Sequence, residues 1–479
     1  MAVAIRRSVW SLPPGDQTLD WYRKAVAELI TRPPSDPSSW RYLAAIHGVP
    51  IDISVPSSAN GFWDQCQHQS WFFLPWHRGY VASFEAVVAK TIIELGGPDG
   101  WALPYWNYSE DLASNPNARL MPPDFFNRLL SNGSPNHLWS RRAQVQNGDF
   151  NLDNSVVTLG ALRLQDFANA TPGAPSGFGG PVTGFHTGGG DNGALENLPH
   201  NRVHVRIGGQ NGFMSDPATA ALDPIFWLHH CNIDRLWEVW RNQGPQFRNP
   251  SSAQWLTNVS FAMHDANRNA ISFVCRDMLD TTRVMHGYRY DTVPVAQEAP
   301  SEEAMEFVMA LGPSPELAGA SEGPVPLESD VTRATILLRP QFASRSALET
   351  TRPGPRRIYL NLENITGTGV PGDFKVYIDM PNDTQPPALA GIMTTFGLER
   401  ASDPNRRHGG SGLSQVFEIT ELADQLGLTQ GTVSQLHVSF VRDAVPLAEN
   451  VVPQGLEEYV QPPRRDSAIR VGRISLFYD

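Results

Sequence analysis

Residues 223–240 read DPIFWLHHCNIDRLWEVW, and this stretch decides the fold of the N-terminal part of the chain. Apolar residues recur every three or four positions from Pro224 to Trp240, which predicts a helix with one buried face. The same periodicity predicts helices over Leu19–Leu29 and Trp76–Leu95. We therefore expect residues 1–291 to form a mainly α domain, a helical bundle with long loops.

Seven of the 13 histidines fall into two groups within this region. The first group is His47, His68 and His77, and the second is His200, His204, His229 and His230. His200 and His204 lie four residues apart, so on a helix their rings project from one face and can hold the same ion. The helix over 224–240 can supply a third imidazole from His230. The first group can do the same, with His77 at a helix start and His68 on the loop before it.

The residues that these groups lack indicate which metal they hold. Dinuclear iron or manganese bundles use glutamates together with Glu-x-x-His, and neither group has a carboxylate at ligand spacing. Zinc hydrolases of the His-Glu-x-x-His type have Glu after the first histidine, where this chain has Asn201. Imidazole-only sites suit copper, so we expect two copper ions per chain and chemistry with oxygen. An eighth histidine, His186, lies in the Gly-rich stretch GFHTGGGDNG and is expected to be a loop residue.

The composition disfavours several other functions. The 479-residue chain has a net charge of −12, which argues against binding nucleic acid, and no apolar run long enough to span a membrane. Its start lacks the apolar core of a signal peptide, and three cysteines cannot form a disulfide framework. We therefore expect a cytoplasmic protein with no nucleic-acid or membrane partner.

The chain changes character after residue 291. Residues 292–330 are rich in Pro and acidic residues and contain no Lys or Arg, which predicts an extended linker. Short β-branched and aromatic runs separated by turn residues follow, such as IYLNL at 358–362, and predict an all-β sandwich over 331–479. Because every grouped histidine precedes the linker, we expect this domain to act as a lid, with Phe307 and Met309 as candidate plugs.

The sequence resembles the family of tyrosinases, catechol oxidases and haemocyanins, which hold a coupled pair of copper ions. It is most similar to fungal-type tyrosinases and related polyphenol oxidases. The matching stretches are LPWHRGYVASFE at 74–85, LPYWNYS at 103–109, HNRVHVRIGG at 200–209 and MSDPATAALDPIFWLHHCNIDRLW at 214–237. A Tyr-x-Tyr at Tyr288 and Tyr290 also matches the place where the catalytic domain of the family closes near an N-terminal arginine, here Arg6 or Arg7.

The resemblance implies a role for each residue of the two groups. It gives copper A to His47, His68 and His77, and copper B to His200, His204 and His230. It makes His229 a neighbour of the ligands and Phe226 a rigid ring between the two copper sites. Cys66 stands two residues before His68 and resembles the Cys-x-His of fungal tyrosinases, in which the sulfur forms a thioether with the imidazole. The alternative for Cys66 is a buried free thiol.

The resemblance also implies a proton acceptor and a substrate pocket. Glu196 and Asn201 correspond to family residues that hold a water able to take the phenolic proton. Glu196 stands four residues before His200, one more than in the fungal pattern. The expected pocket residues are Val205, Met214, Ser215 and Asp216. The carboxylate of Asp216 is expected to attract cationic phenols.

The expected reaction is oxidation of phenols and o-diphenols (catechols) to o-quinones with molecular oxygen, together with ortho-hydroxylation of monophenols. Three alternatives stay open at this point: a catechol oxidase or an o-aminophenol oxidase without efficient hydroxylation, and a haemocyanin-like oxygen carrier. The expected partners are phenolic small molecules and oxygen, with the C-terminal domain covering the active site.

Overall fold

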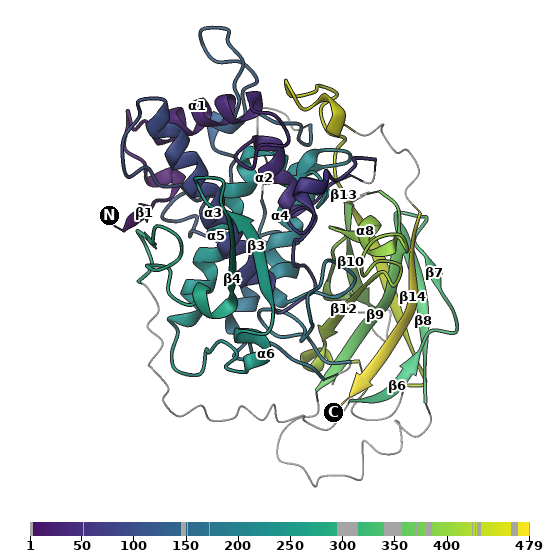
Figure 1. The fold of residues 1–479 in the computed structure, drawn as a ribbon. Helices are drawn as coiled ribbons and strands as arrows, with labels where there is room; N and C mark the ends of the chain where they lie inside the picture. Colours follow the sequence, from purple (N-terminus) through teal and green to yellow (C-terminus); the bar gives the residue numbers. More distant parts are fainter. Residues whose placement is uncertain are drawn as a thin grey trace.

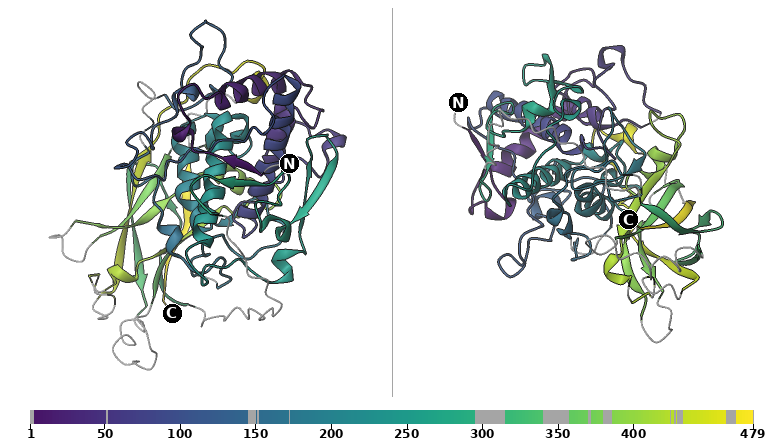
Figure 2. Two further views of the ribbon diagram at one scale, coloured as in Figure 1. Left: turned by 90° about the vertical axis from the view of Figure 1, so that its left-hand side faces the viewer. Right: turned by 90° about the horizontal axis from the view of Figure 1, so that it is seen from below.

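The computed structural model describes residues 3–50, 52–144, 150, 152–171, 173–294, 315–339, 357–369, 372–379, 386–423, 425–426, 428, 433–460 and 468–478. These residues form a helical domain and a β-rich domain that lie side by side (Figures 1 and 2). Among the helices so described, none combines the length and apolarity needed to cross a membrane.

Five helices build the core of the first domain. They are α1 (Thr18–Thr31), α2 (Trp40–His47), α3 (Phe73–Glu94), α4 (Arg202–Gly208) and α5 (Pro224–Arg241). The expected helices agree with α1, α3 and α5 to within a few residues at each end, whereas α2 was not predicted. Asp223 fixes the start of α5 because its carboxylate accepts a hydrogen bond from the Ile225 amide, and Pro224 suits the first helical position.

Two small strand pairs complete this domain. Strand β3 (Ser260–His264) pairs with β4 (Ala270–Val274) after the short helix α6 (Ala253–Leu256). Strand β1 (Ala4–Arg6) pairs in parallel with β5 (Tyr288–Tyr290). The guanidinium of Arg6 lies 3.5 Å from the centroid of the Tyr288 ring and donates to Tyr290 Oη at 3.1 Å. Arg6, and not the exposed Arg7, is therefore the arginine beside the Tyr-x-Tyr.

The strands of the second domain form one continuous hydrogen-bonded sheet, so the sandwich that we predicted is supported only in part. Its strands are β6 (Glu316–Ala320), β7 (Val325–Pro326), β8 (Val331–Leu338), β9 (Ile358–Gly367), β10 (Gly372–Ile378), β11 (Ala388–Met393), β12 (Leu413–Glu418), β13 (Gln435–Ala444) and β14 (Ile469–Tyr478). The order is β11-β10-β13-β8-β6-β14-β9-β12-β2, with β7 on β14. Strand β6 joins the two halves because it pairs with both β8 and β14. Both halves still bury side chains in one core, including Phe374 and Leu360.

The boundary between the domains also differs from the expected one. Strands β6 and β7 lie within residues 292–330, which we expected to be a linker, and both pair with β14. Phe307 and Met309, the candidate plugs, lie outside the described residues. Strand β2 (Gly190–Asp191) of the first domain extends the sheet beside β12. The chain as a whole is therefore not mainly α, because a helical core is combined with a β-rich domain that begins before residue 331.

Candidate metal centre

Seven histidine rings converge between α2, α3, α4 and α5. His47 ends α2, His77 lies near the start of α3, His204 lies on α4, and His229 and His230 lie on α5. His68 and His200 come from the segments that precede α3 and α4. None of the seven is more than 4% exposed. The helical domain thus encloses a dense cluster of imidazoles, the donor set expected for copper.

The ring nitrogens are arranged in two groups that each fit one metal ion. The Nε2 atoms of His47 and His68 lie 3.3 Å apart, and so do those of His204 and His230. Two nitrogens that bind one ion at about 2.0–2.1 Å with tetrahedral angles lie roughly 3.3–3.4 Å apart. The Nε2 atoms of His77 and His200 are buried and have no hydrogen-bond partner among the described residues. Burying a nitrogen without a hydrogen-bond partner costs free energy, so an ion bound by each group would stabilise the site.

The second nitrogen of five of these rings is fixed by an oxygen. In the first group, the Nδ1 of His47 donates to Pro217 O at 2.7 Å, that of His68 to Glu196 Oε1 at 3.1 Å, and that of His77 to Phe73 O at 2.8 Å. In the second group, the Nδ1 of His200 donates to Asn201 Oδ1 and that of His204 to Met214 O, both at 2.8 Å. Each Nε2 therefore keeps a free lone pair for a metal. Burial lowers the pKa of His47 to about 4 and that of His200 to about 3. These rings are thus neutral at neutral pH, which is the form that binds metal.

Phe226 and His229 pack against the ligand candidates. The ring centroid of Phe226 lies 5.1 Å from that of His47 and 4.1 Å from that of His230, so this ring contacts one histidine of each group. Nδ1 of His229 lies 2.9 Å from Tyr108 Oη. Its ring stacks on that of His200, with centroids 5.3 Å apart. His229 and His230, adjacent on α5, thus have different partners, and only His229 is tied to a tyrosine.

Cys66 is buried beside the first group. Its sulfur and the ring nitrogens of His47 and His68 lie within 4.8 Å of one another. Burial raises the pKa of its thiol to about 12, so the sulfur is held here as a neutral thiol. The geometry therefore brings Cys66 close to the imidazole that the Cys-x-His motif pairs with it.

Glu196 and Asn201 each contact one histidine of a different group. The fully buried carboxylate of Glu196 accepts a hydrogen bond from His68 and another, at 3.0 Å, from the Gln69 amide. Burial raises the pKa of Glu196 to about 8, although the Gln69 amide acts in the opposite direction. Asn201 binds His200 through Oδ1, and its Nδ2 lies 3.4 Å from Thr394 Oγ1 of the second domain. A carboxyl group and an amide thus border the metal centre.

Three of the four expected pocket residues are buried next to His204. They are Val205, Met214 and Ser215. Asp216 differs because it is exposed, and its carboxylate accepts a hydrogen bond from the Ala218 amide at 2.8 Å. It also interacts electrostatically with Arg400 of the second domain. Asp216 therefore lies at the interface between the two domains and not inside the site.

One residue of the second domain packs against the histidine cluster and was not predicted from the sequence. Phe396 lies in the turn between β11 and α8 (Leu398–Ser402) of the second domain and is fully buried. Its ring stacks on that of His204, with centroids 4.2 Å apart and planes 21° apart. The rings of His68 and His200 lie at 5.7 and 5.6 Å. One phenylalanine ring thus contacts histidines of both groups, and no local sequence signal marks it.

Ion pairs join the second domain to the helical domain. Arg400 pairs with Asp64 at 2.6 Å, and Arg202 of α4 pairs with Asp443 at 2.5 Å. The side chain of Arg202 is fully buried and that of Arg400 nearly so. His186, expected to be a loop residue, does lie in a loop, and its ring stacks on that of His408 of the second domain, with centroids 4.9 Å apart. The contacts between the domains therefore include buried ion pairs, and removing one partner of such a pair would leave an uncompensated buried charge.

Comparison with known proteins identifies the family of the chain. The family model for the common central domain of tyrosinase matches residues 37–243, which contain all seven clustered histidines. A tyrosinase of Hahella sp. (strain CCB-MM4) is 35% identical over 98% of this chain and 98% of its own. The chain belongs to the tyrosinase family. It is accordingly a copper oxidoreductase that binds two copper ions and oxidises phenols at that dinuclear site.

Other members of the tyrosinase and polyphenol oxidase family agree with this assignment. The chloroplastic (+)-larreatricin hydroxylase of Larrea tridentata is 26% identical over 89% of this chain and 76% of its own. The solved structure of latent apple tyrosinase aligns over 100% of this chain and 97% of its own, with a TM-score of 0.61 and 19% identity, which indicates a shared fold. Residues 314–479 match a domain of unknown function, DUF7868. That match begins close to the start of β6 and so agrees with the observed extent of the sheet.

Proposed function

We propose that this chain hydroxylates monophenols at the ortho position as well as oxidising o-diphenols to o-quinones. The observation that carries the hydroxylation is the position of Glu196 and Asn201 at the metal centre. A monophenol, with a pKa of about 10, must lose its proton to become reactive. Glu196 is a buried carboxyl group held beside the metal centre by His68 and the Gln69 amide, which makes it our candidate to accept that proton. When bound, the copper pair supplies the activation of oxygen and the two-electron oxidation.

We assign copper A to His47, His68 and His77, and copper B to His200, His204 and His230. The converging Nε2 atoms and the oxygen-bound Nδ1 atoms support this set. His229 keeps its hydrogen bond to Tyr108 and positions the neighbouring rings. Phe226 packs between the ions and keeps the two groups apart.

The proposed hydroxylation can be tested with tyramine and 4-methylcatechol on copper-loaded protein from which the lid contact has been removed by Phe396→Ala. We expect this variant to act on both substrates. Adding Glu196→Gln should slow tyramine hydroxylation by roughly a hundredfold, the lower end of general-base effects, and catechol oxidation far less. Glutamine can still accept a hydrogen bond from His68, so copper binding should persist. Rapid oxidation of 4-methylcatechol with no action on tyramine would favour the catechol oxidase alternative.

We also propose that Cys66 and His68 are joined by a thioether bond. Support comes from the short separation of the sulfur and the His68 ring within a fully buried site. Forming the bond removes one hydrogen from each partner, so the bridged peptide should be lighter by two hydrogens. Peptide mass spectrometry of active, copper-loaded protein measures this difference directly. Quantitative alkylation of Cys66 in that same protein would disprove the bond, and Cys231 and Cys275, which are also buried, serve as internal controls.

Asp216 is proposed to favour cationic substrates. It is exposed beside the loop that leads to α5, so its negative charge faces solvent near the second copper group. Because Arg400 offsets this charge in the closed chain, the effect should appear once the second domain is displaced. We expect Asp216→Asn to reduce the preference for tyramine over a phenol carboxylate by roughly threefold at low salt, and less at high salt. An unchanged ratio of kcat/KM values would show that Asp216 is only a solvated loop residue.

We further propose that the second domain keeps the intact chain latent. Support comes from Phe396, whose ring covers the histidines where a phenol ring would have to approach. Thr394 adds a polar contact, since its hydroxyl donates to Asn197 Oδ1 at 2.8 Å and accepts from Asn201 Nδ2. Asp373 holds the same turn by accepting a hydrogen bond from the Thr395 amide at 3.1 Å. In the closed chain this turn therefore contacts the ligand rings through Phe396 and the side-chain amide of Asn201 through Thr394.

A further inference from the structure

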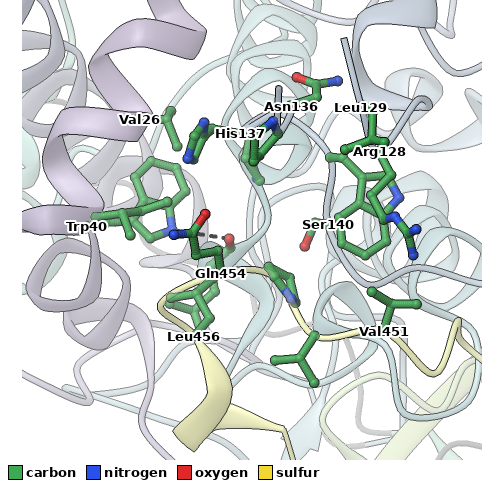
Figure 3. Close-up of a pocket in the computed structure, with 17 residues that line it drawn as sticks. Val26, Trp40, Arg128, Leu129, Asn136, His137, Ser140, Val451, Gln454 and Leu456 are labelled. Carbon is green, nitrogen blue, oxygen red and sulfur yellow. Dashed lines mark hydrogen bonds between the residues drawn. The ribbon is translucent and has the colours of Figure 1, made fainter. Parts of the chain in front are cut away.

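A cavity of about 250 Å³ lies apart from the metal centre, where a C-terminal arm crosses the helical domain (Figure 3). We define the arm as residues 445–460, which follow β13. The walls of the cavity come from α1, α2, the loop 128–140 and the start of α5, and the arm closes it with residues 451–454 and 456. The cavity therefore belongs to both domains and exists only while the arm is in place.

The arm is attached to the helical domain by backbone hydrogen bonds. The Gln144 amide donates to Leu447 O at 2.8 Å, and the Ala448 amide donates to Gln210 O at 2.8 Å. The Glu449 amide donates to Arg142 O at 2.9 Å. These bonds fix the arm immediately before the residues that line the cavity.

The cavity has apolar walls and one unsatisfied polar group. Trp40 and Trp139 contribute aromatic surface, and most of the other lining residues are aliphatic or proline: Val26, Ile30, Leu129, Pro135, Leu222, Pro224, Val451, Val452, Pro453 and Leu456. Ser140 is 1% exposed, and its hydroxyl has no hydrogen-bond partner among the described residues. Figure 3 shows this hydroxyl directed into the cavity. A buried hydroxyl without a partner favours a ligand that can hydrogen-bond to it.

The charged groups around the cavity favour an anion. Arg128 is exposed at its edge, and none of the residues that the structure describes forms an ion pair or hydrogen bond with its guanidinium. Burial and the nearby charge of Arg23 lower the pKa of His137, so this ring is neutral at neutral pH. Asp124 does not line the cavity and is paired with Arg23. No carboxylate lines the cavity, so no acidic side chain there repels a negatively charged ligand that Arg128 attracts.

We propose that this cavity binds a single-ring aromatic monocarboxylate. The ring would lie against the indole surfaces, and the carboxylate would face the side that carries Ser140 and Arg128 (Figure 3). The volume is slightly below the range of about 300–1,000 Å³ found for drug-sized ligands, so it suits one ring and a short chain. Because the arm forms part of the wall, such a ligand binds the closed arrangement and stabilises it. This consequence for the enzyme rests on the proposed lid function.

Binding can be tested with 4-fluorophenylacetate and the copper-loaded full-length chain, followed by fluorine NMR. We expect saturable binding that Arg128→Gln weakens roughly fivefold through loss of one partly exposed charge contact. Arg163→Gln, at an exposed arginine of the same domain outside the cavity, is the matched control and should leave the affinity unchanged. Ser140→Leu should fill the cavity and abolish binding. Binding that survives Arg128→Gln but is lost in His204→Ala would place the probe at the metal centre and overturn the proposal, as would no binding at all.

Hydrogen exchange of residues 445–460 tests the link to the arm without using enzyme activity. A saturating probe should slow exchange of this segment at least roughly threefold in the wild-type chain, and not in Ser140→Leu. Unchanged exchange in the presence of demonstrated binding would show that the ligand does not hold the arm. The activity of Phe396→Ala reports on the lid separately, so a failure of the lid and a failure of this site give different results.

Discussion

Replacing His204 or His77 with alanine should remove about one of the two copper ions and abolish phenol oxidation. Each variant deletes one imidazole from a buried group whose nitrogens are arranged around a common point. Two histidines cannot complete a three-nitrogen site. Losing a residue that merely supports a ligand costs roughly 10- to 100-fold, so losing a ligand should cost more. Copper content by elemental analysis, with catechol oxidation as the second readout, measures the effect.

Two alanine variants serve as controls for this prediction. His229→Ala changes the histidine that the assignment leaves outside copper B and should keep both copper ions, because His200, His204 and His230 still supply three imidazoles to that ion. His286→Ala changes an exposed histidine and should behave as the wild type. If His77→Ala and His204→Ala both retain two copper ions, the ligand assignment is wrong. If His229→Ala loses one, His229 binds copper and the assignment within copper B must be revised.

The parts of the site that the sequence predicted are those set by local periodicity. The i, i+4 spacing of His200 and His204 places both rings on one side of the start of α4, and the periodic run of α5 places His230 four residues after Phe226. The arginine beside the Tyr-x-Tyr came instead from the family resemblance, which left Arg6 and Arg7 open until the structure placed Arg6 there. In these regular helices, the spacing of two residues along the sequence determines whether their side chains lie on the same face.

Local spacing fails where the backbone is irregular or the contact joins distant segments. Leu198 is extended, with φ −139° and ψ 122°, so the four-residue separation of Glu196 and His200 does not follow helical geometry. The Glu196 carboxylate instead reaches His68, 128 residues away in sequence. Phe396 belongs to a short turn without any motif, and only the docking of two domains brings it to His204. The sequence did not indicate that β6 joins the two halves of the sheet, because the composition of β6 matches that of the acidic segment around it.

Phe396→Ala should convert a latent chain into an active one while copper binding stays intact. The ring is fully buried and stacks on His204, so truncation removes both the obstacle and a packed contact between the domains. Truncating a buried phenylalanine costs about 3–5 kcal/mol, and each 1.4 kcal/mol changes an equilibrium tenfold. We therefore expect the apparent KM for a bulky catechol such as 4-tert-butylcatechol to fall at least roughly tenfold. Leu389→Ala, at an exposed residue of β11, is the control and should leave the chain latent.

Cutting the chain between Pro300 and Pro313 should activate it less than Phe396→Ala does. The cut lies before β6, so it leaves the sheet whole but lowers the effective concentration of the lid. The cut domain stays attached through the ion pair of Arg202 with Asp443 and through the pairing of β2 with β12. Combining the cut with Arg202→Gln, which leaves Asp443 without this partner, should therefore weaken the attachment of the domain and lower the apparent KM further. Equal KM values for the intact chain, the cut chain and Phe396→Ala, each with two copper ions, would show that the second domain is no lid.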